Sequence, residues 1–335
     1  MKRLFTGLCM AWGNFCFIPG LKKWDENARS LMLGWLPLIG VVIGGLWALI
    51  YFGLVYASLP YLLVTFIMAF LPFFLSGFIH VDGFMDCNDA MLSRGTLEKK
   101  QSILKDSRCG TFAVVTLIFT ALCFYSSLGS AISYGIDFVN LIAITAISRS
   151  VSGLEVLISR PMATSQYAAM AAEYEEEDEE TSESCSKISE YGFSLSDEED
   201  DESYSENAFV TDGFEEDTSA DDGKEAEDAD VQNMAGESTV TAAEDIMPEE
   251  SKKDKPASIQ HGVYLLVAQL ILVLVLVFLF CKYYLVTAFV VVGTALGTLI
   301  SCSIAKKSLG GMNGDIAGYS IIWGEMIGVI LLALV

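Results

Sequence analysis

Long apolar segments constrain the fold of this chain more than any other feature. Seven runs, near 31–57, 61–79, 110–128, 136–159, 260–280, 283–304 and 316–335, are long enough to cross a hydrocarbon core of about 30 Å as α-helices. Backbone polar groups find no water inside a bilayer, so spanning segments must form their hydrogen bonds internally. The sequence therefore predicts an all-α, polytopic membrane bundle of about seven transmembrane helices. We expect the preceding residues, Leu4 to Phe17, to form a short membrane-surface or re-entrant segment.

Basic residues predict the orientation of the bundle. Seven spans with a cytoplasmic N-terminus leave Lys282 as the exterior base and place the following bases on the other side: Lys2, Arg3, Lys22, Lys23, Arg29, Arg94, Lys99, Lys100, Lys105, Arg108, Lys252, Lys253, Lys255, Lys306 and Lys307. Connections on the cytoplasmic side of a membrane carry the excess of Lys and Arg. We therefore expect residues 80–111 and 310–318 to emerge on the cytoplasmic face.

The net charge of −23 belongs to one segment. Residues 164–258 hold 32 of the 43 acidic side chains and only 5 of the 20 basic ones. Such a segment cannot bury enough apolar surface to offset its chain entropy, so we expect an acidic, disordered cytoplasmic loop. It divides the membrane domain into a first part, 1–163, and a second part, 259–335. We expect the loop only to repel itself; a docking site for a basic partner or a loose cation buffer is the alternative.

The most informative polar stretch is His80-Val-Asp-Gly-Phe-Met-Asp-Cys-Asn-Asp89, at the end of the second apolar run. In a helix, Asp82, Asp86 and Asp89 would share one face. Carboxylates so placed repel each other unless a cation lies between them, and Mg²⁺ prefers a few carboxylates together with substrate phosphates. We expect a metal site here rather than a solvated loop. His80 is equally compatible with a general base and with a histidine bonded to a nearby carbonyl.

Further polar groups occur beside the other apolar runs. Lys105, Ser107, Arg108 and Thr111 precede or begin a span and predict a phosphate site at a helix N-terminus, although snorkelling cations are the plainer explanation. Arg149 lies inside an apolar run and could pair with Glu155 or reach a substrate phosphate. In the run 309–318, Asp315 is a fourth expected metal or substrate carboxylate, and the glycines there suggest close approach of a ligand or helix. Glu325 would lie nearly three turns deeper on a similar face, where an interhelical hydrogen bond is the plainer explanation.

Three motifs in this order resemble those of the cobalamin synthase family, the adenosylcobinamide-GDP ribazoletransferases. They are the stretches Gly77 to Ala90, Leu104 to Phe112 and Leu309 to Glu325, and the resemblance covers the chain except the acidic loop. The resemblance implies a bacterial inner-membrane enzyme with its active site on the cytoplasmic face. Such an enzyme joins adenosylcobinamide-GDP and α-ribazole, or its 5′-phosphate, to give adenosylcobalamin, or its 5′-phosphate, and GMP.

The resemblance also assigns expected roles to individual residues. Mg²⁺ would be held by Asp82, Asp86, Asp89 and Asp315; His80 or one of the aspartates would take the proton; and Lys105, Ser107, Arg108, Thr111, Arg149, Arg160 and Asn313 would bind substrate. Phe17 stands near a position where the family tends to carry arginine, and Asn313 replaces a threonine of the family motif.

Two other functions are weighed against this one. A CDP-alcohol phosphotransferase making lipids also uses clustered aspartates, but its motif requires an Ala-Arg pair after Asp-Gly and wider aspartate spacing. A cation-coupled transporter would be expected to show internal repeats and acids near mid-membrane, and neither is evident. Besides substrates we expect the lipid bilayer as a partner and no nucleic acid. A homo-oligomer is compatible with the sequence, which does not reveal the oligomeric state.

Overall fold

The computed structural model describes residues 2–21, 23–106, 108–163, 165, 167 and 259–334, and these form an all-helical bundle. The elements are α1 (Lys2–Phe15), a 3₁₀ turn η1 (Glu26–Ala28), α2 (Arg29–Gly34), α3 (Leu36–Tyr56), α4 (Tyr61–Leu75), α5 (Ile79–Leu92), α6 (Leu97–Leu104), α7 (Thr111–Tyr134), α8 (Phe138–Ile158), α10 (Ile259–Phe280), α11 (Tyr284–Leu309) and α12 (Gly314–Leu334). The predicted fold class is therefore confirmed. Ser107 and nearly all of the acidic segment 164–258 lie outside the described residues, so its predicted disorder stays a prediction.

The number of spans agrees with the prediction. Within the described residues, α3, α7, α8, α10, α11 and α12 are each long and apolar enough to cross a membrane, and the number rises to seven if the bent pair α4–α5 is one broken span rather than a re-entrant loop. The first predicted run begins with a separate short helix, α2, before α3 starts at Leu36. Helix α1 packs against α2 and α3, and its expected place at the membrane surface stays a prediction.

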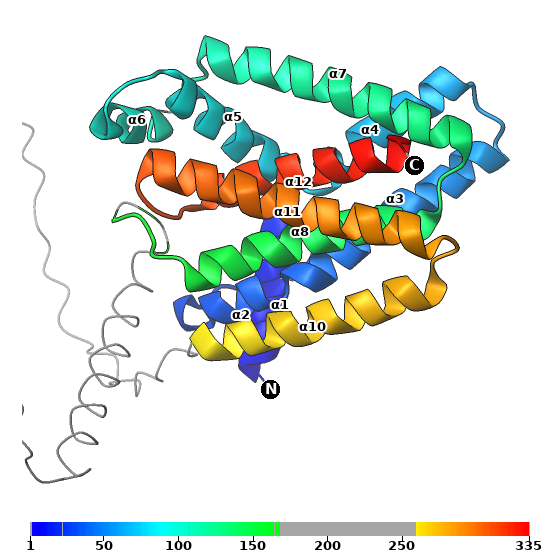
Figure 1. Cartoon of the computed structure of the whole chain (residues 1–335). Coiled ribbons are helices and arrows are strands. Elements are labelled where there is room, and N and C mark those ends of the chain that lie inside the picture. The colour runs from blue at the N-terminus through cyan, green and yellow to red at the C-terminus, as the bar shows by residue number, and fades with distance from the viewer. Residues whose placement is uncertain are drawn as a thin grey trace, which may run out of the picture. The chain divides into compact units, whose positions relative to one another are not determined.

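Helices α8 and α12 form the centre of the bundle. Helix α8 packs against α3, α10, α11 and α12, as Figure 1 shows, and most of its residues are buried. Small residues allow this packing: a Cβ atom on Gly40 of α3 would lie 2.5 Å from the Thr145 carbonyl oxygen of α8. The Thr145 hydroxyl donates to the Gly40 carbonyl at 2.8 Å. Close backbone approach with hydroxyl hydrogen bonds is the usual way in which helices associate in membranes.

A sharp bend separates α4 from α5. The predicted straight run to residue 79 ends earlier, at Leu75, and the two helix axes differ by 88°. Gly77 and Phe78 both adopt left-handed backbone conformations, with φ of 65° and 61°. Only glycine adopts this conformation without strain, so Phe78 must be held in it by its surroundings. The bend turns α5 away from the direction of α4.

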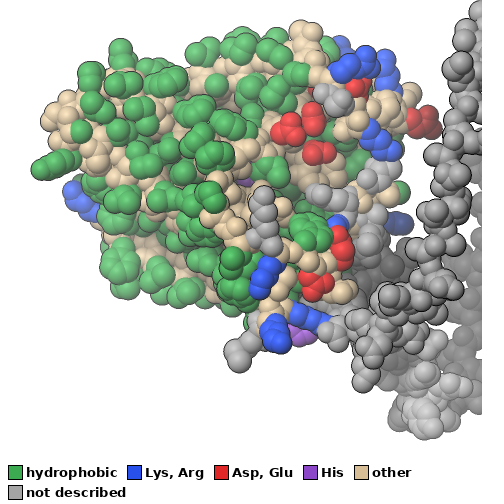
Figure 2. All heavy atoms as spheres, turned by 180° about the vertical axis from the view of Figure 1, so that it is seen from behind, with side chains coloured by type: hydrophobic (Ala, Val, Ile, Leu, Met, Phe, Trp, Pro, Cys, Tyr) green, Lys and Arg blue, Asp and Glu red, His purple; other side chains and the backbone are tan. Residues whose placement is uncertain are grey.

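Charged side chains concentrate at one end of the bundle. Figure 2 shows them gathered towards one end of the visible face, while apolar side chains cover the remainder. The same end contains α6, whose Gln101 donates to the Leu309 carbonyl at 2.9 Å, and the turn between α11 and α12 (Figure 1). The helices run in directions that bring together the connections rich in Lys and Arg, which the sequence predicted to lie on one side of the membrane. Lys282 follows α10 at the opposite end, where its backbone N–H bonds Asp137 at 2.8 Å.

Candidate active site

Helix α5 presents the three predicted aspartates. It covers Ile79–Leu92 as one continuous helix, so Asp82, Asp86 and Asp89 project from one face, as the spacing predicted. Asp82 is exposed, whereas Asp86 and Asp89 are half-buried. The apolar side of the same helix packs inwards through Phe84, whose ring stacks on Tyr319 of α12 with 5.8 Å between ring centroids. The acids therefore lie on the polar side of a well-anchored helix.

Glycines bring α5 and α12 into backbone contact at the acids. A Cβ atom on Gly83 would lie 2.7 Å from the Asp315 Cα atom, and one on Gly318 would lie 3.0 Å from the His80 Cα atom. Real Cβ atoms do not tolerate the first distance, so glycine at 83 is what permits this crossing. The expectation that glycines in 309–318 admit a close neighbour is correct at Gly318, and the neighbour there is a helix.

Asn313 positions Asp315. The Ile316 backbone N–H donates to the Asn313 side-chain oxygen at 2.9 Å, which caps the first turn of α12. The Asn313 amide nitrogen in turn donates to Asp315 Oδ2 at 2.8 Å. Both asparagine and threonine are good N-cap residues, which explains physically why Asn313 can stand where the resembling family has threonine. The expected substrate contact of Asn313 stays a prediction.

The four carboxylates form one electrostatic group. Asp82, Asp89 and Asp315 all lie close enough to Asp86 to repel its charge, and Asp82 acts likewise on Asp315. We call these four residues the acid cluster. Hard carboxylate oxygens are the ligands that Mg²⁺ prefers, and Mg²⁺ usually takes one or two of them together with waters and substrate phosphates. Nowhere in the described part of the chain do three His, Cys, Asp or Glu side chains converge into a ready metal cage. It is the chemistry of the donors, and not a preformed cage, that fits a Mg²⁺ ion shared with substrate phosphates.

The start of α7 lies against Asp89. Gly110 is the N-cap of α7, and any Cβ atom there would collide with the Asp89 carboxylate oxygens. Unpaired backbone N–H groups at a helix N-terminus favour anions, and Asp89 is the anion nearest to this one. The predicted phosphate site is thus adjacent to Asp89, a member of the acid cluster.

The cations of the 105–111 motif are exposed. The Arg108 side chain is 87% exposed, and its guanidinium pairs with Asp106 at 2.7 Å. The hydrogen bond from Arg108 lowers the pKa of the Asp106 carboxyl. Among the described residues, no hydrogen bond or ion pair joins the side chains of Lys105, Thr111 or Arg160 to the acid cluster, so their roles in binding substrate stay predictions.

A cavity of about 310 Å³ opens beside Asp82 and Asp315. Its walls come from α2, from the starts of α3, α5 and α12, from the end of α1 and from the second half of α8; they include Asn14, Phe15, Trp24, Arg29, His80 and Ser152. His80 is buried, with 5% of its surface exposed, and its ring stacks on that of Phe15. His80 Nε2 is buried and has no hydrogen-bond partner within the described residues. His80 Nε2 therefore forms no hydrogen bond with a neighbouring carbonyl of the described residues, although such a bond was one of the two interpretations of this histidine.

Sequence reasoning missed most of this cavity. Arg29 entered only as one of the orienting bases, although it lies over the Trp24 ring at 5.6 Å and pairs with Glu26 at 2.5 Å. The available signal was the dense polar stretch from Asp25 to Ser30 immediately before an apolar run. Phe17, the departure from the family arginine, packs on Phe74 with 4.7 Å between ring centroids and supports the end of α4.

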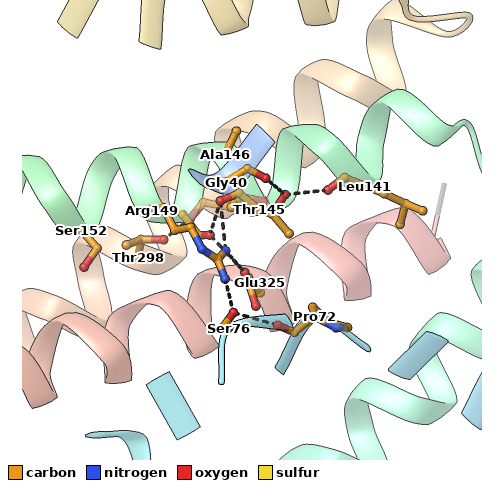
Figure 3. Close-up of polar contacts among 12 residues, drawn as sticks. Gly40, Pro72, Ser76, Leu141, Thr145, Ala146, Arg149, Ser152, Thr298 and Glu325 are labelled. Carbon is orange, nitrogen blue, oxygen red and sulfur yellow. Dashed lines mark hydrogen bonds and ion pairs between the residues drawn. The ribbon is translucent and has the colours of Figure 1, made fainter. Parts of the chain in front are cut away.

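Arg149 has a different carboxylate partner from the one considered in the sequence, and its expected role in binding substrate stays a prediction. It does not pair with Glu155, whose carboxylate instead accepts a hydrogen bond from Lys306. The Arg149 guanidinium forms an ion pair with Glu325 of α12 and donates to the Ser76 hydroxyl at 2.8 Å (Figure 3). Arg149 and Glu325 are both buried, so the expected interhelical bond of Glu325 is confirmed. Ser76 belongs to the bend before α5, and the pair therefore fixes the bend to the bundle centre.

The end of α8 is attached to the loop that carries Asn313. Met312 donates its backbone N–H to the Arg160 carbonyl at 3.0 Å, and Met162 donates to the Met312 carbonyl at 2.9 Å. This pair forms an isolated parallel bridge between Pro161 and Met312. The side chain of Arg160 is exposed at the same end of the bundle. Backbone contacts thus connect the third motif to the segment containing Arg160.

Comparisons with known proteins identify relatives of this chain. The chain matches the family described as Cobalamin-5-phosphate synthase over residues 7–181 and 238–334. An adenosylcobinamide-GDP ribazoletransferase of Clostridium perfringens is 34% identical over 169 residues, which cover 50% of this chain and 67% of the relative. Relatives of the same name from Clostridium botulinum (36% over 152 residues, 45% of this chain and 60% of the relative) and Halalkalibacterium halodurans (38% over 120 residues, 35% and 46%) also match. No solved structure matches the chain.

Proposed function

This chain belongs to the cobalamin-5-phosphate synthase family, and from that premise we infer that it is an adenosylcobinamide-GDP ribazoletransferase. The substrates are adenosylcobinamide-GDP and α-ribazole or its 5′-phosphate. A ribazole hydroxyl oxygen attacks the phosphorus that bears the cobinamide, the bond from that phosphorus to the GMP oxygen breaks, and the hydroxyl proton leaves. The observation that carries the proposal is the gathering of four carboxylates beside a cavity at the end of a membrane bundle.

We propose Mg²⁺ as the cofactor, held by oxygens of Asp82, Asp86, Asp89 and Asp315. When bound, the ion would offset negative charge on the diphosphate and on the leaving GMP. The hard oxygen donors and their mutual repulsion support this choice over a softer metal. The cluster binds and orients the diphosphate only when a cation is present, because four carboxylates alone would repel it.

We assign the remaining residues to neutralising the charge of the phosphoryl group and to accepting the proton. Lys105 and Arg108 are on the connection that leads to the start of α7, next to Asp89, and we assign them to the transferred phosphoryl group. Arg108 would exchange its Asp106 partner for phosphate. His80 is a base of suitable chemistry, since its Nε2 has no partner among the described residues and both it and Asp82 line the cavity.

We also propose that the active site faces the cytoplasm of a bacterial inner membrane. The basic connections lie at the same end of the bundle as the acid cluster, and such connections are retained on the cytoplasmic side. Nucleotide substrates and Mg²⁺ are available there.

Purified protein in detergent tests the proposal directly. With both substrates and Mg²⁺, we expect GMP and a cobalamin product in equal amounts, and chelation by EDTA should stop both until Mg²⁺ is returned. Release of GMP without α-ribazole would indicate simple hydrolysis. No product under any metal would overturn the assignment, and cation uptake into liposomes without chemistry would favour the transporter.

A further inference from the structure

The residues that line the cavity beside the acid cluster are of two chemical kinds, which we call its apolar side and its polar side. One side is apolar, from Met32, Leu33, Leu36, Val156 and Ile321. The other side contains polar groups, including Asn14, Arg29, His80, Asp82 and Ser152. Planar rings of Phe15 and Trp24 also line it. A ligand that matches both sides needs a flat apolar body and a hydroxyl-rich end.

We propose that this cavity is the binding site of α-ribazole, with its base on the apolar side and its ribose on the polar side. The inference rests on the proposed function and adds which substrate occupies which place. α-Ribazole is a nucleoside whose dimethylbenzimidazole base has a largely apolar edge, whereas its sugar carries the hydroxyls. The two ends of the molecule therefore correspond to the two sides of the cavity.

The size of the cavity selects among the parts of the substrates. At about 310 Å³ it lies at the small end of the range for ligand pockets. A nucleoside is of this order, whereas a corrin ring with its side chains is much larger. The corrin must therefore lie outside this cavity, which leaves the ribazole and the guanosine as candidate occupants.

The polarity of the walls separates these two candidates. Guanine carries several hydrogen-bonding groups along its edge, and each would lose its water against leucine, valine and isoleucine side chains. A buried polar group without a partner costs about 1–3 kcal/mol, so several such groups oppose guanine strongly. Dimethylbenzimidazole has no such edge and gains from burial of its methyl groups.

The polar side is arranged to receive a sugar. His80 is more than nine-tenths buried, lines the cavity, and has an Nε2 atom without a partner among the described residues. A ribose hydroxyl would satisfy this atom, which otherwise remains unpaired at a cost. Asp82 and Asp315 belong both to the cavity wall and to the acid cluster. A ribose hydroxyl bound between them would therefore lie beside the diphosphate that it attacks.

The two substrates then approach from different sides. The attacking nucleoside enters from the cavity formed with α1, α2, α3 and α8, and the diphosphate lies along α5 towards Asp89 and the start of α7. Asp82 and Asp315 form the boundary between them.

Adding volume to the cavity tests this assignment. Ala317 lines it from α12, and Ala333, on the same helix near its other end, does not, so Ala333→Leu is the matched control. For Ala317→Leu we expect the KM for α-ribazole to rise about tenfold or more, since mismatched volume in an apolar pocket has effects of that order. The KM for adenosylcobinamide-GDP should stay within about twofold, and Ala333→Leu should change neither. Should Ala317→Leu fail to fold, Val156→Leu adds volume from α8 and is judged by the same criterion.

Binding measured without turnover separates this inference from the proposed function. In equilibrium dialysis with purified wild-type protein, α-ribazole alone should bind, Ala317→Leu should weaken that binding, and guanosine in excess should not displace it. A rise in the KM for adenosylcobinamide-GDP only, an unchanged KM for α-ribazole, or displacement by guanosine would each overturn the assignment. Absence of turnover together with normal α-ribazole binding would count against the proposed function and leave the site standing.

Discussion

Helix α12 carries two acidic residues, and they lie in opposite electrostatic surroundings. Glu325, near the middle of the helix, is matched by one cation: its carboxylate pairs with Arg149, and both side chains are almost wholly buried. Asp315, in the first turn, lies among three further carboxylates and receives a hydrogen bond from the neutral Asn313. The buried pair holds the bend before α5 through Ser76, whereas the acid cluster stays unmatched by protein cations in the described residues.

This contrast helps to separate structural from functional charge. Removing one member of a buried pair leaves a charge without solvent or partner, which folding cannot tolerate. Removing one member of a repelling group relieves repulsion and should leave folding unharmed. We therefore expect that replacing an acid of the cluster abolishes activity but leaves the protein folded. Replacing Arg149 should instead lower the stability of the fold.

The largest expected effect is the loss of activity in Asp86→Asn. The substitution keeps shape and removes one charge from the centre of the acid cluster, so GMP release should become undetectable while the protein remains folded. Turnover assays and thermal unfolding in detergent would be run side by side. Normal turnover, or turnover lost together with the fold, would remove the distinction between the two regions.

Arg149→Ala should have the largest effect on folding. It strands Glu325 in the bundle centre, and breaking a buried pair costs about 3–5 kcal/mol. The double variant Arg149→Met/Glu325→Leu should recover most of that stability, because the stranded charge is gone. Arg108→Ala, which breaks the exposed pair with Asp106, is the matched control and should leave stability almost unchanged. Denaturant unfolding in detergent provides the comparison; equal losses for Arg149→Ala and Arg108→Ala would contradict it.

Gly83→Ala should have an intermediate effect. The added methyl group meets the Asp315 backbone, and overpacking of this kind costs about 1–3 kcal/mol. Activity should fall as well, because α5 and α12 must separate at the acid cluster. Gly45→Ala is the control, since a Cβ atom there meets nothing within 4 Å. If both variants unfold at the same temperature, the backbone contact at Gly83 is not as tight as described.

The smallest expected effect is at Asn313. Asn313→Ala removes the cap of α12 and should cost about 1 kcal/mol, whereas Asn313→Thr should retain most of it. Thermal unfolding of the two variants would distinguish them. Equal destabilisation would show that the side chain acts through Asp315 alone.

Local pattern was enough to predict much of the fold and of the cluster. Apolar length predicted the spans, and the spacing of Asp82, Asp86 and Asp89 predicted their shared helical face. The partner of Arg149 was not predictable in this way, because Glu325 comes from a helix distant in sequence. Helical geometry did argue against Glu155: six residues along a helix do not face each other.

Two other features required three-dimensional information. The bend at Gly77 and Phe78 depends on left-handed backbone that sequence does not signal at a phenylalanine. The cavity is assembled from several helices, so the polar stretch from Asp25 to Ser30 could mark Arg29 as unusual but could not by itself predict a cavity. Asn313 could have been anticipated as a cap from its position before Gly314 and Asp315.

The crossing of Gly83 with Asp315 has a consequence for how tolerant this protein can be. Where two main chains touch, the separation of the groups they carry is set by the helices themselves and not by adjustable side chains. If the acidic side chain at position 82 or 315 is lengthened or shortened, the helices therefore cannot shift to restore the position of its carboxylate. We expect Asp82→Glu to reduce turnover as much as a neutral replacement at position 82 does, because the crossing helices cannot move to restore the spacing of the carboxylates.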